Sequence, residues 1–165
     1  MPEEQVVERA KRDKEEGKSA STQAGEFVRE EMHHIREGKH GARSPQQAIA
    51  IGLSKARRAG VDLPPSQGAS EKTRKQARRE MKTAKRAGKH KPSPRRSRST
   101  SKALRREGHS AASLSELAQH ARSASKRRGS KARHQAAAKA VRTKGPRGLR
   151  TAARKAARTR DRQPR

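Results

Sequence analysis

The densest group of side chains that could bind a metal ion lies in one short histidine-rich stretch. On a helix, Glu30 and His34 lie one turn apart, and so do His33 and Glu37, with His40 following soon after. Imidazole nitrogens and carboxylate oxygens are ligands that zinc accepts. The same spacing also produces a solvated helix face on which carboxylates pair with imidazoles, and a closed metal site needs further groups that orient its ligands. We therefore predict a solvated face, with no metal and no cofactor.

Two other motifs contain parts of catalytic sequences. The sequence GKS at residues 17–19 matches the end of a phosphate-binding loop, but Arg12 stands where that loop needs its first glycine. Ser113, Glu116 and His120 are the residue types of a hydrolase triad. Helix capping already explains the first two of these, and no apolar sequence surrounds them to form a pocket. We predict that the protein is not an enzyme, with no catalytic residue and no small-molecule substrate.

Basic side chains dominate the composition and indicate the kind of partner. The 165 residues include 45 Lys and Arg against 16 Asp and Glu, a formal net charge of +29, with no cysteine and Phe27 as the only aromatic residue. Disulfides and thiolate metal sites are thereby excluded. Large apolar residues are too few to wall an enzyme pocket, and neither a membrane span nor a signal peptide is visible. We expect a cytoplasmic, nucleoid-associated chain that binds a polyanion.

The charge is distributed unevenly along the chain. Residues 1–63 carry 12 basic and 11 acidic side chains, whereas residues 64–165 carry 33 basic and 5 acidic ones. The paired prolines that open the second part favour an extended linker. We predict three parts: a near-neutral helical module over residues 1–63, a basic helix plus a Pro/Ser/Arg-rich linker over residues 64–112, and an Ala/Lys/Arg-rich basic helical tail over residues 113–165.

The sequence of residues 1–63 predicts three helices, each ended by a glycine. They cover about residues 2–16, about residues 21–37, and the stretch from Pro45 to Gly60, which Ser44 precedes as an N-cap. Apolar residues at helical spacing give the second and third helices a face that packs into a hairpin. These positions are Phe27, Val28, Met32, Ile35, Ile49, Leu53 and Ala56. Because so small a core is marginal, we expect self-association through these helices or a partner that completes it.

The sequence of residues 64–165 predicts helices that do not pack around a hydrophobic core. Residues 70–88 favour a helix, but their apolar stripe of Ala77, Met81 and Ala84 is too thin to drive tertiary packing. Residues 91–101, rich in Pro, Ser and Arg, are expected to be extended and mobile.

Further along, Ser113 begins a capping box and predicts a helix from Leu114 to about Arg128. Beyond it, two segments of Ala, Lys and Arg are separated by Gly145-Pro146, and we expect them to become helical on bound phosphate. The predicted fold class is all-α, with a small helical hairpin or three-helix N-terminal module and a largely disordered or conditionally helical basic C-terminal region.

Residues 21–65, STQAGEFVREEMHHIREGKHGARSPQQAIAIGLSKARRAGVDLPP, resemble a family of small, basic, uncharacterised bacterial proteins. Its members are labelled as a domain of unknown function, or as DNA-binding or plasmid-stabilisation proteins. Residues 101–129 resemble a second element of such proteins. The C-terminal tail is similar in composition to linker-histone tails. The resemblance implies no mechanism and assigns no catalytic residue.

Charge and composition together predict non-sequence-specific DNA binding and compaction, as in a histone-like nucleoid-associated protein that neutralises phosphates. Direct reading of bases needs a rigid element, and stacking on single strands needs aromatic residues, neither of which this tail provides. Thirteen side chains are predicted to contact phosphates: Arg95, Arg96, Arg98, Arg127, Arg128, Lys131, Arg133, Lys139, Arg142, Lys144, Arg154, Lys155 and Arg158. Two alternatives stay open, an RNA- or ribosome-associated basic protein and a partner protein in plasmid maintenance or stress response.

Overall fold

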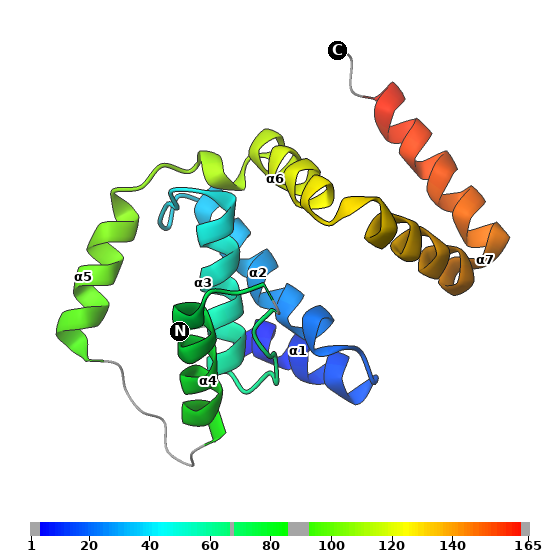
Figure 1. Ribbon diagram of the computed structural model, residues 1–165. Helices are drawn as coiled ribbons and strands as arrows, with labels where there is room; N and C mark the ends of the chain where they lie inside the picture. The colour runs from blue at the N-terminus through cyan, green and yellow to red at the C-terminus, as the bar shows by residue number, and fades with distance from the viewer. Residues whose placement is uncertain (1–3, 67, 86–92, 163–165) are drawn as a thin grey trace. The chain divides into compact units, whose positions relative to one another are not determined.

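The computed structural model describes residues 4–66, 68–85 and 93–162, and every regular element within them is helical (Figure 1). The elements are α1 (Glu4–Glu15), α2 (Ala20–Arg36), α3 (Pro45–Arg58), α4 (Glu71–Lys85), α5 (Pro94–Arg105), the short 3-10 helix η1 (Ser110–Ala112), α6 (Leu114–Arg127) and α7 (Gly129–Asp161). The chain divides into two compact units, Met1–His120 and Ala121–Arg165. The predicted all-α class and the three helices of residues 1–63 are confirmed.

No helix in the described part of the chain is both long enough and apolar enough to cross a membrane.

The first unit has a core built around the hairpin of α2 and α3. One apolar cluster joins α1 to this hairpin, with Phe27 fully buried at its centre. A second cluster lies further along α2 around Ile35, and it takes in the alanines of η1. The first cluster comprises Val6, Ala10, Ala24, Phe27, Ala56 and Val61. The second comprises Met32, Ile35, Ala42, Ala48, Ala111 and Ala112. The predicted hairpin is therefore present, and a distant segment adds to its core.

The end of α3 follows the expected glycine stop. Gly60 has a φ of 95°, which places it in the left-handed region that favours glycine. Its N–H donates to the carbonyl of Arg57, and the N–H of Val61 donates to the carbonyl of Ala56, both at 3.1 Å. These two bonds are the paired bonds of a Schellman motif, and they return Val61 to the core beside Ala56.

The start of α3 is capped as the sequence predicts, with one difference. Ser44 Oγ accepts the backbone N–H of Gln47 at 3.3 Å. The Gln47 side chain reaches back to the N–H of Arg43 at 2.7 Å, one residue earlier than in the usual capping box. The cap therefore also fixes the residue that enters the helix.

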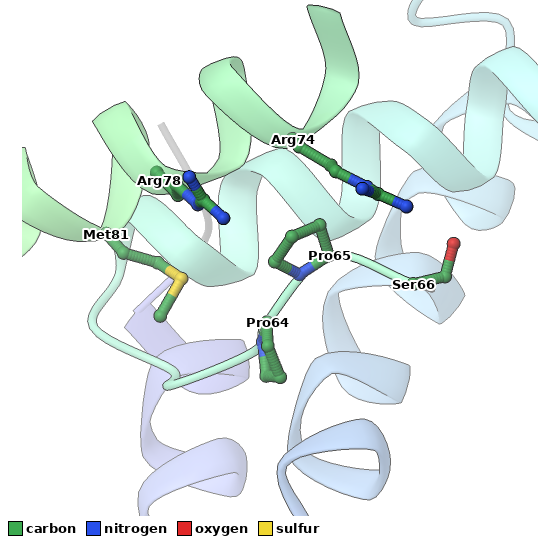
Figure 2. A pocket seen from close by; sticks show the side chains of 6 residues that line it. All are labelled: Pro64, Pro65, Ser66, Arg74, Arg78 and Met81. Carbon is green, nitrogen blue, oxygen red and sulfur yellow. The ribbon is translucent and has the colours of Figure 1, made fainter. Parts of the chain in front are cut away.

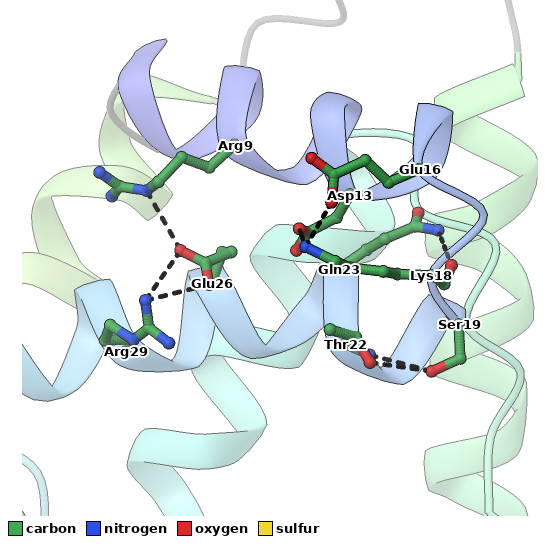
Figure 3. A network of polar contacts seen from close by, with 9 residues as sticks. All are labelled: Arg9, Asp13, Glu16, Lys18, Ser19, Thr22, Gln23, Glu26 and Arg29. Atoms are coloured by element: carbon green, nitrogen blue, oxygen red, sulfur yellow. Dashed lines mark hydrogen bonds and ion pairs between the residues drawn. The ribbon is translucent and has the colours of Figure 1, made fainter. Parts of the chain in front are cut away.

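One ion pair joins α1 to α2 in the first unit, and a second pair lies beside it within α2 (Figure 3). Glu26 on α2 accepts Arg9 of α1 at 3.1 Å and Arg29 of its own helix at 3.1 Å. Exposed pairs of this kind contribute little to stability, so the apolar cluster carries most of the packing between these helices.

The turn between α1 and α2 is held by Lys18 (Figure 3). Its ammonium lies 2.7 Å from both Asp13 and Glu16, and these hydrogen bonds, the one to Asp13 foremost, raise its pKa. The backbone carbonyl of Lys18 accepts the amide of Gln23 at 2.8 Å. Ser19 then caps α2, with its Oγ accepting the N–H of Thr22.

The prediction that the helix of residues 70–88 lacks tertiary packing is wrong, because α4 packs against α3. Ala77 is only 1% exposed, since its small side chain lets the two helices approach closely. Beside it, Glu80 Oε1 accepts Ser54 Oγ of α3 at 2.5 Å and Gln76 Nε2 at 3.0 Å. The buried carboxylate of Glu80 thus attaches α4 to α3 through polar contacts. The prediction considered only the apolar residues of this helix and therefore missed them.

The expectation that residues 91–101 are extended is also wrong for the part that the structure describes. Residues 91 and 92 lie outside the described residues, and α5 begins at Pro94. Proline suits the first helical position because its φ is already near the helical value and its missing N–H has no partner there. Arginine, lysine, leucine and alanine continue the helix to Arg105.

The disorder predicted for the basic C-terminal region is not what the structure shows. Ser113 Oγ accepts the N–H of Glu116 at 3.2 Å and caps α6 as predicted. The long α7 is helical and has no buried residue. Alanine explains this, because its helix propensity offsets like-charge repulsion without any need for a core.

The predicted break between the two halves of the tail is confirmed. Gly145 has a φ of 61° and a ψ of 175°, so the helix is interrupted there. A residue before proline is sterically excluded from the helical region, and Pro146 cannot donate a helical hydrogen bond. The tail therefore consists of two helical halves joined at a bend.

Candidate nucleic-acid interface

All thirteen side chains predicted to contact phosphates are exposed on helices or at helix ends. Arg95, Arg96 and Arg98 lie on α5, Arg127 ends α6, Arg128 precedes α7, and the other eight lie on α7: Lys131, Arg133, Lys139, Arg142, Lys144, Arg154, Lys155 and Arg158. Among the described residues, none of the thirteen forms an ion pair with a carboxylate, and Asp161 is the only acidic residue in α7. Their charges are therefore available to an external anion.

The second half of α7 places four arginines on one face. Arg147, Arg150, Arg154 and Arg158 are spaced i, i+3, i+7 and i+11, so they fall within a sector of about 80°. Over these eleven steps the helix rises about 16 Å. That length spans about five base pairs of duplex DNA.

Two members of this stripe, Arg147 and Arg150, were not among the thirteen predicted contacts. Both are exposed. Composition gave no reason to choose them, whereas their helical spacing with Arg154 and Arg158 does.

The basic residues of α5 follow the same pattern. Arg95, Arg98, Lys102 and Arg105 are spaced i, i+3, i+7 and i+10 and share one face. Three of them, with Arg106, line a shallow open depression. Sequence reasoning found the first two of this set and missed Lys102 and Arg105. Residues 91–101 were expected to be extended, so no helical spacing connected these two residues to Arg95 and Arg98.

A second open groove lies in the first unit, between α4 and the segment that follows α3. Arg74 and Arg78 project from α4 toward Pro65 and Ser66, with Met81 and Pro64 at the other end (Figure 2). Its walls are proline rings, one thioether, one serine hydroxyl and two guanidinium groups, and no histidine or carboxylate lies among these residues to serve as a base. This groove adds positive charge to the first unit and offers no catalytic arrangement.

The histidine-rich stretch separates into two environments. On the exposed side, His33 Nδ1 lies 2.9 Å from Glu37 Oε1, and Lys39 Nζ lies 3.1 Å from Glu37 Oε2. The hydrogen bond from Lys39, followed by the charges of Lys39 and His33, holds the pKa of Glu37 below its usual range. This is a solvated pairing of the kind that the spacing predicts.

On the inner side, Glu31, His34 and His40 converge. One potential ligand atom from each lies within 4.8 Å of the others. Glu31 is fully buried, with its Oε1 at 3.3 Å from His40 Nε2 and its Oε2 at 2.6 Å from Lys55 Nζ of α3. Sequence reasoning chose Glu30 instead of Glu31. In the sequence, only the i, i+3 spacing of Glu31 and His34 indicates that these two side chains lie close together. The position of His40 beside them depends on the path of the connection after α2, which no spacing indicates.

Comparison with known proteins extends to the first unit alone. Residues 11–67 match the model of a family of unknown function (DUF6496). No curated protein and no solved structure matches the chain. The matched range runs from α1 to the segment after α3, so it contains the hairpin and the Glu31–His34–His40 group. All thirteen predicted phosphate contacts lie beyond it.

Proposed function

We propose that the protein binds duplex DNA through its exposed basic helices and compacts it without reading the base sequence. The observation that supports this is that all thirteen predicted contacts are exposed, together with the absence of carboxylate partners for them in the described part of the chain. Fixed positive charges of this density gain free energy by displacing the counterions condensed on phosphates.

The lack of a core around the basic helix α7 explains the expected lack of sequence specificity. A helix presents its arginines in stripes that follow a phosphate backbone. The part of α7 that would contact DNA has no buried residue, so no core fixes it in a groove in one orientation. Base-specific contacts need such fixing, whereas phosphate contacts do not.

A salt titration of the whole protein on duplex DNA tests the proposal. If about ten side chains meet phosphates together, log K falls against log salt with a slope of about −9. A slope near −1 would contradict the proposal. Double-stranded RNA of equal length belongs in the same assay, because tighter binding to RNA would favour the alternative of an RNA-associated protein.

Removing three charges from α7 and, separately, three from α1 tests whether DNA binds to the α7 surface or responds only to the net charge of the protein. We expect the triple change Arg150→Gln, Arg154→Gln and Arg158→Gln to make the salt slope less negative by about 2.7, since each lost contact removes about 0.9.

The control removes the same charge from α1, by Lys11→Gln, Arg12→Gln and Lys14→Gln, all at exposed positions. Its slope should equal that of the unchanged protein. Equal effects of the two triple changes would show that net charge alone, and not the α7 surface, determines binding.

Compaction of DNA needs either two binding surfaces on one chain or an association of chains. The two halves of α7 supply the first. Self-association through the N-terminal helices stays a prediction, and sedimentation equilibrium of the full chain tests it.

A further inference from the structure

We propose that Glu31, His34 and His40 bind a divalent transition-metal ion, for which zinc is the best match. Two imidazoles and one carboxylate are a ligand set that zinc accepts, with water in the fourth position. The three residues come from α2 and from the connection after it, and their ligand atoms lie within 4.8 Å of one another. This inference is independent of DNA binding, because it concerns the first unit and not the basic helices.

The orientation of His40 supports a metal ligand. Its Nδ1 lies 3.2 Å from the backbone carbonyl of Gly41, which can only accept a hydrogen bond. In a neutral imidazole, Nδ1 then carries the proton and Nε2 presents a lone pair. A histidine that binds metal through Nε2 commonly donates its other N–H to a backbone carbonyl in this way.

The atom that Nε2 faces is itself an acceptor. Glu31 Oε1 lies 3.3 Å away, is buried, and accepts no hydrogen bond from the described residues. A lone pair on Nε2 and a carboxylate oxygen at this separation repel each other unless a proton or a metal ion lies between them. A tetrahedral zinc ion with bonds of about 2.0 Å places its ligand atoms about 3.3 Å apart, so the observed separation matches one edge of such a site.

The second oxygen of Glu31 is already engaged. Lys55 Nζ lies 2.6 Å from Oε2 and 3.7 Å from Glu30 Oε2. Lys55 therefore acts as a positioning residue that holds the carboxylate with Oε1 turned toward His40.

Both histidines are partly exposed, whereas Glu31 is not. A metal ion can therefore enter from the solvent side and keep a water ligand there. Bound in this position, it would connect α2 to the connection that leads to α3.

Calorimetric titration of the full chain with zinc, after removal of metal by a chelator, tests the inference. We expect one high-affinity ion per chain, and an affinity at least about tenfold lower in His34→Gln and in His40→Gln. The matched control is His33→Gln, which removes an exposed imidazole from the same helix. It should bind zinc as the unchanged protein does. Equal binding in all four proteins, or no binding in any, would overturn the inference.

Cobalt absorption provides a second measurement that does not depend on the folding of the ligand variants. Cobalt(II) bound to the unchanged protein and to His33→Gln should give the intense visible bands of a four-coordinate ion. A weak, six-coordinate spectrum would contradict the site. Circular dichroism of each variant confirms its helical fold, and zinc should raise the melting temperature of the unchanged protein but not that of His40→Gln.

Discussion

Gly41 donates its backbone N–H to the carbonyl of Leu104 at 2.9 Å. The next residue, Ala42, donates to the carbonyl of Gly108 at 3.0 Å. Arg36 Nε reaches the carbonyl of Ala112 at 2.8 Å. The segment between α5 and α6 is thus fixed to the connection between α2 and α3, beside the residue His40 of the proposed metal site.

The change Gly41→Ala should break this contact. A Cβ at Gly41 would lie 1.9 Å from the carbonyl oxygen of Glu107 and 2.6 Å from that of Gly108, so the backbone must shift. We expect a loss of about 2–4 kcal/mol in the free energy of unfolding, by analogy with other overpacked sites. Urea denaturation measures the loss, and hydrogen exchange at Ala42 should show that its amide loses protection.

Gly25→Ala is the control for this change. Gly25 lies within α2, and a Cβ there meets no atom within 4 Å. Alanine in an open helix position should stabilise the protein by about 0.5–1 kcal/mol. A Gly41→Ala protein as stable as the unchanged one would show that the segment is not docked on the hairpin.

Gly52 marks the closest approach of α2 and α3. A Cβ at Gly52 would lie 2.7 Å from Val28 Cα. In an open helix this glycine would cost stability, yet here Gly52→Ala should lower the free energy of unfolding by about 1–3 kcal/mol, because the helices must move apart. Urea denaturation measures whether Gly52→Ala lowers or raises the free energy of unfolding. A gain in stability would mean that the two helices are not in close contact at this point. The control is Ala50→Ser on the exposed face of α3, which should lower the free energy of unfolding by only about 0.5 kcal/mol through helix propensity.

Glu80 should be the main polar attachment of α4 to α3. The change Glu80→Ala removes the acceptor of Ser54 and Gln76, and leaves Arg57, 3.7 Å from the carboxylate, without its partner. Because these donors are only partly buried or exposed, we expect a loss of about 1 kcal/mol in the free energy of unfolding.

The matched control is Glu71→Ala, on the same helix, which loses only an exposed pair with Lys75 and should change stability by about 0.5 kcal/mol or less. Hydrogen exchange along α4, compared between the two variants, measures the effect. If the amides of α4 are equally protected from hydrogen exchange in both variants, Glu80 does not hold the helix in place.

The features that sequence predicts correctly are those set by near neighbours in the chain. Ser44 caps α3 and Gly60 ends it because the interacting atoms lie within six residues of each other. The contact of Gly41 with Leu104 has no such local cause. The helices α3 and α4 and almost all of α5 lie between its partners in the chain, so no spacing rule indicates it.

The error over the basic tail has a different origin. Composition rules for disorder count large apolar side chains, since these supply the core that offsets chain entropy. The helix α7 has no buried residue and does not depend on a core. Its backbone hydrogen bonds and alanine content give local order that such rules do not measure, and this order turns scattered charges into the stripes of α5 and α7.

The bend at Gly145 and Pro146 gives the last prediction. The left-handed φ of Gly145 suits glycine, and Pro146 removes one helical hydrogen bond. The double change Gly145→Ala and Pro146→Ala should favour one continuous helix by about 4 kcal/mol, the sum of the two propensity differences. Far-ultraviolet circular dichroism should therefore show more helix. The control Ala136→Ser, a weak propensity change in the first half of α7, should not raise the helix content.

The double change leaves the number of charges unchanged, so the salt slope on DNA should be preserved. Compaction of DNA should weaken if the bend sets the angle between the two basic halves. Unaltered helix content in the double variant would contradict a break at this position.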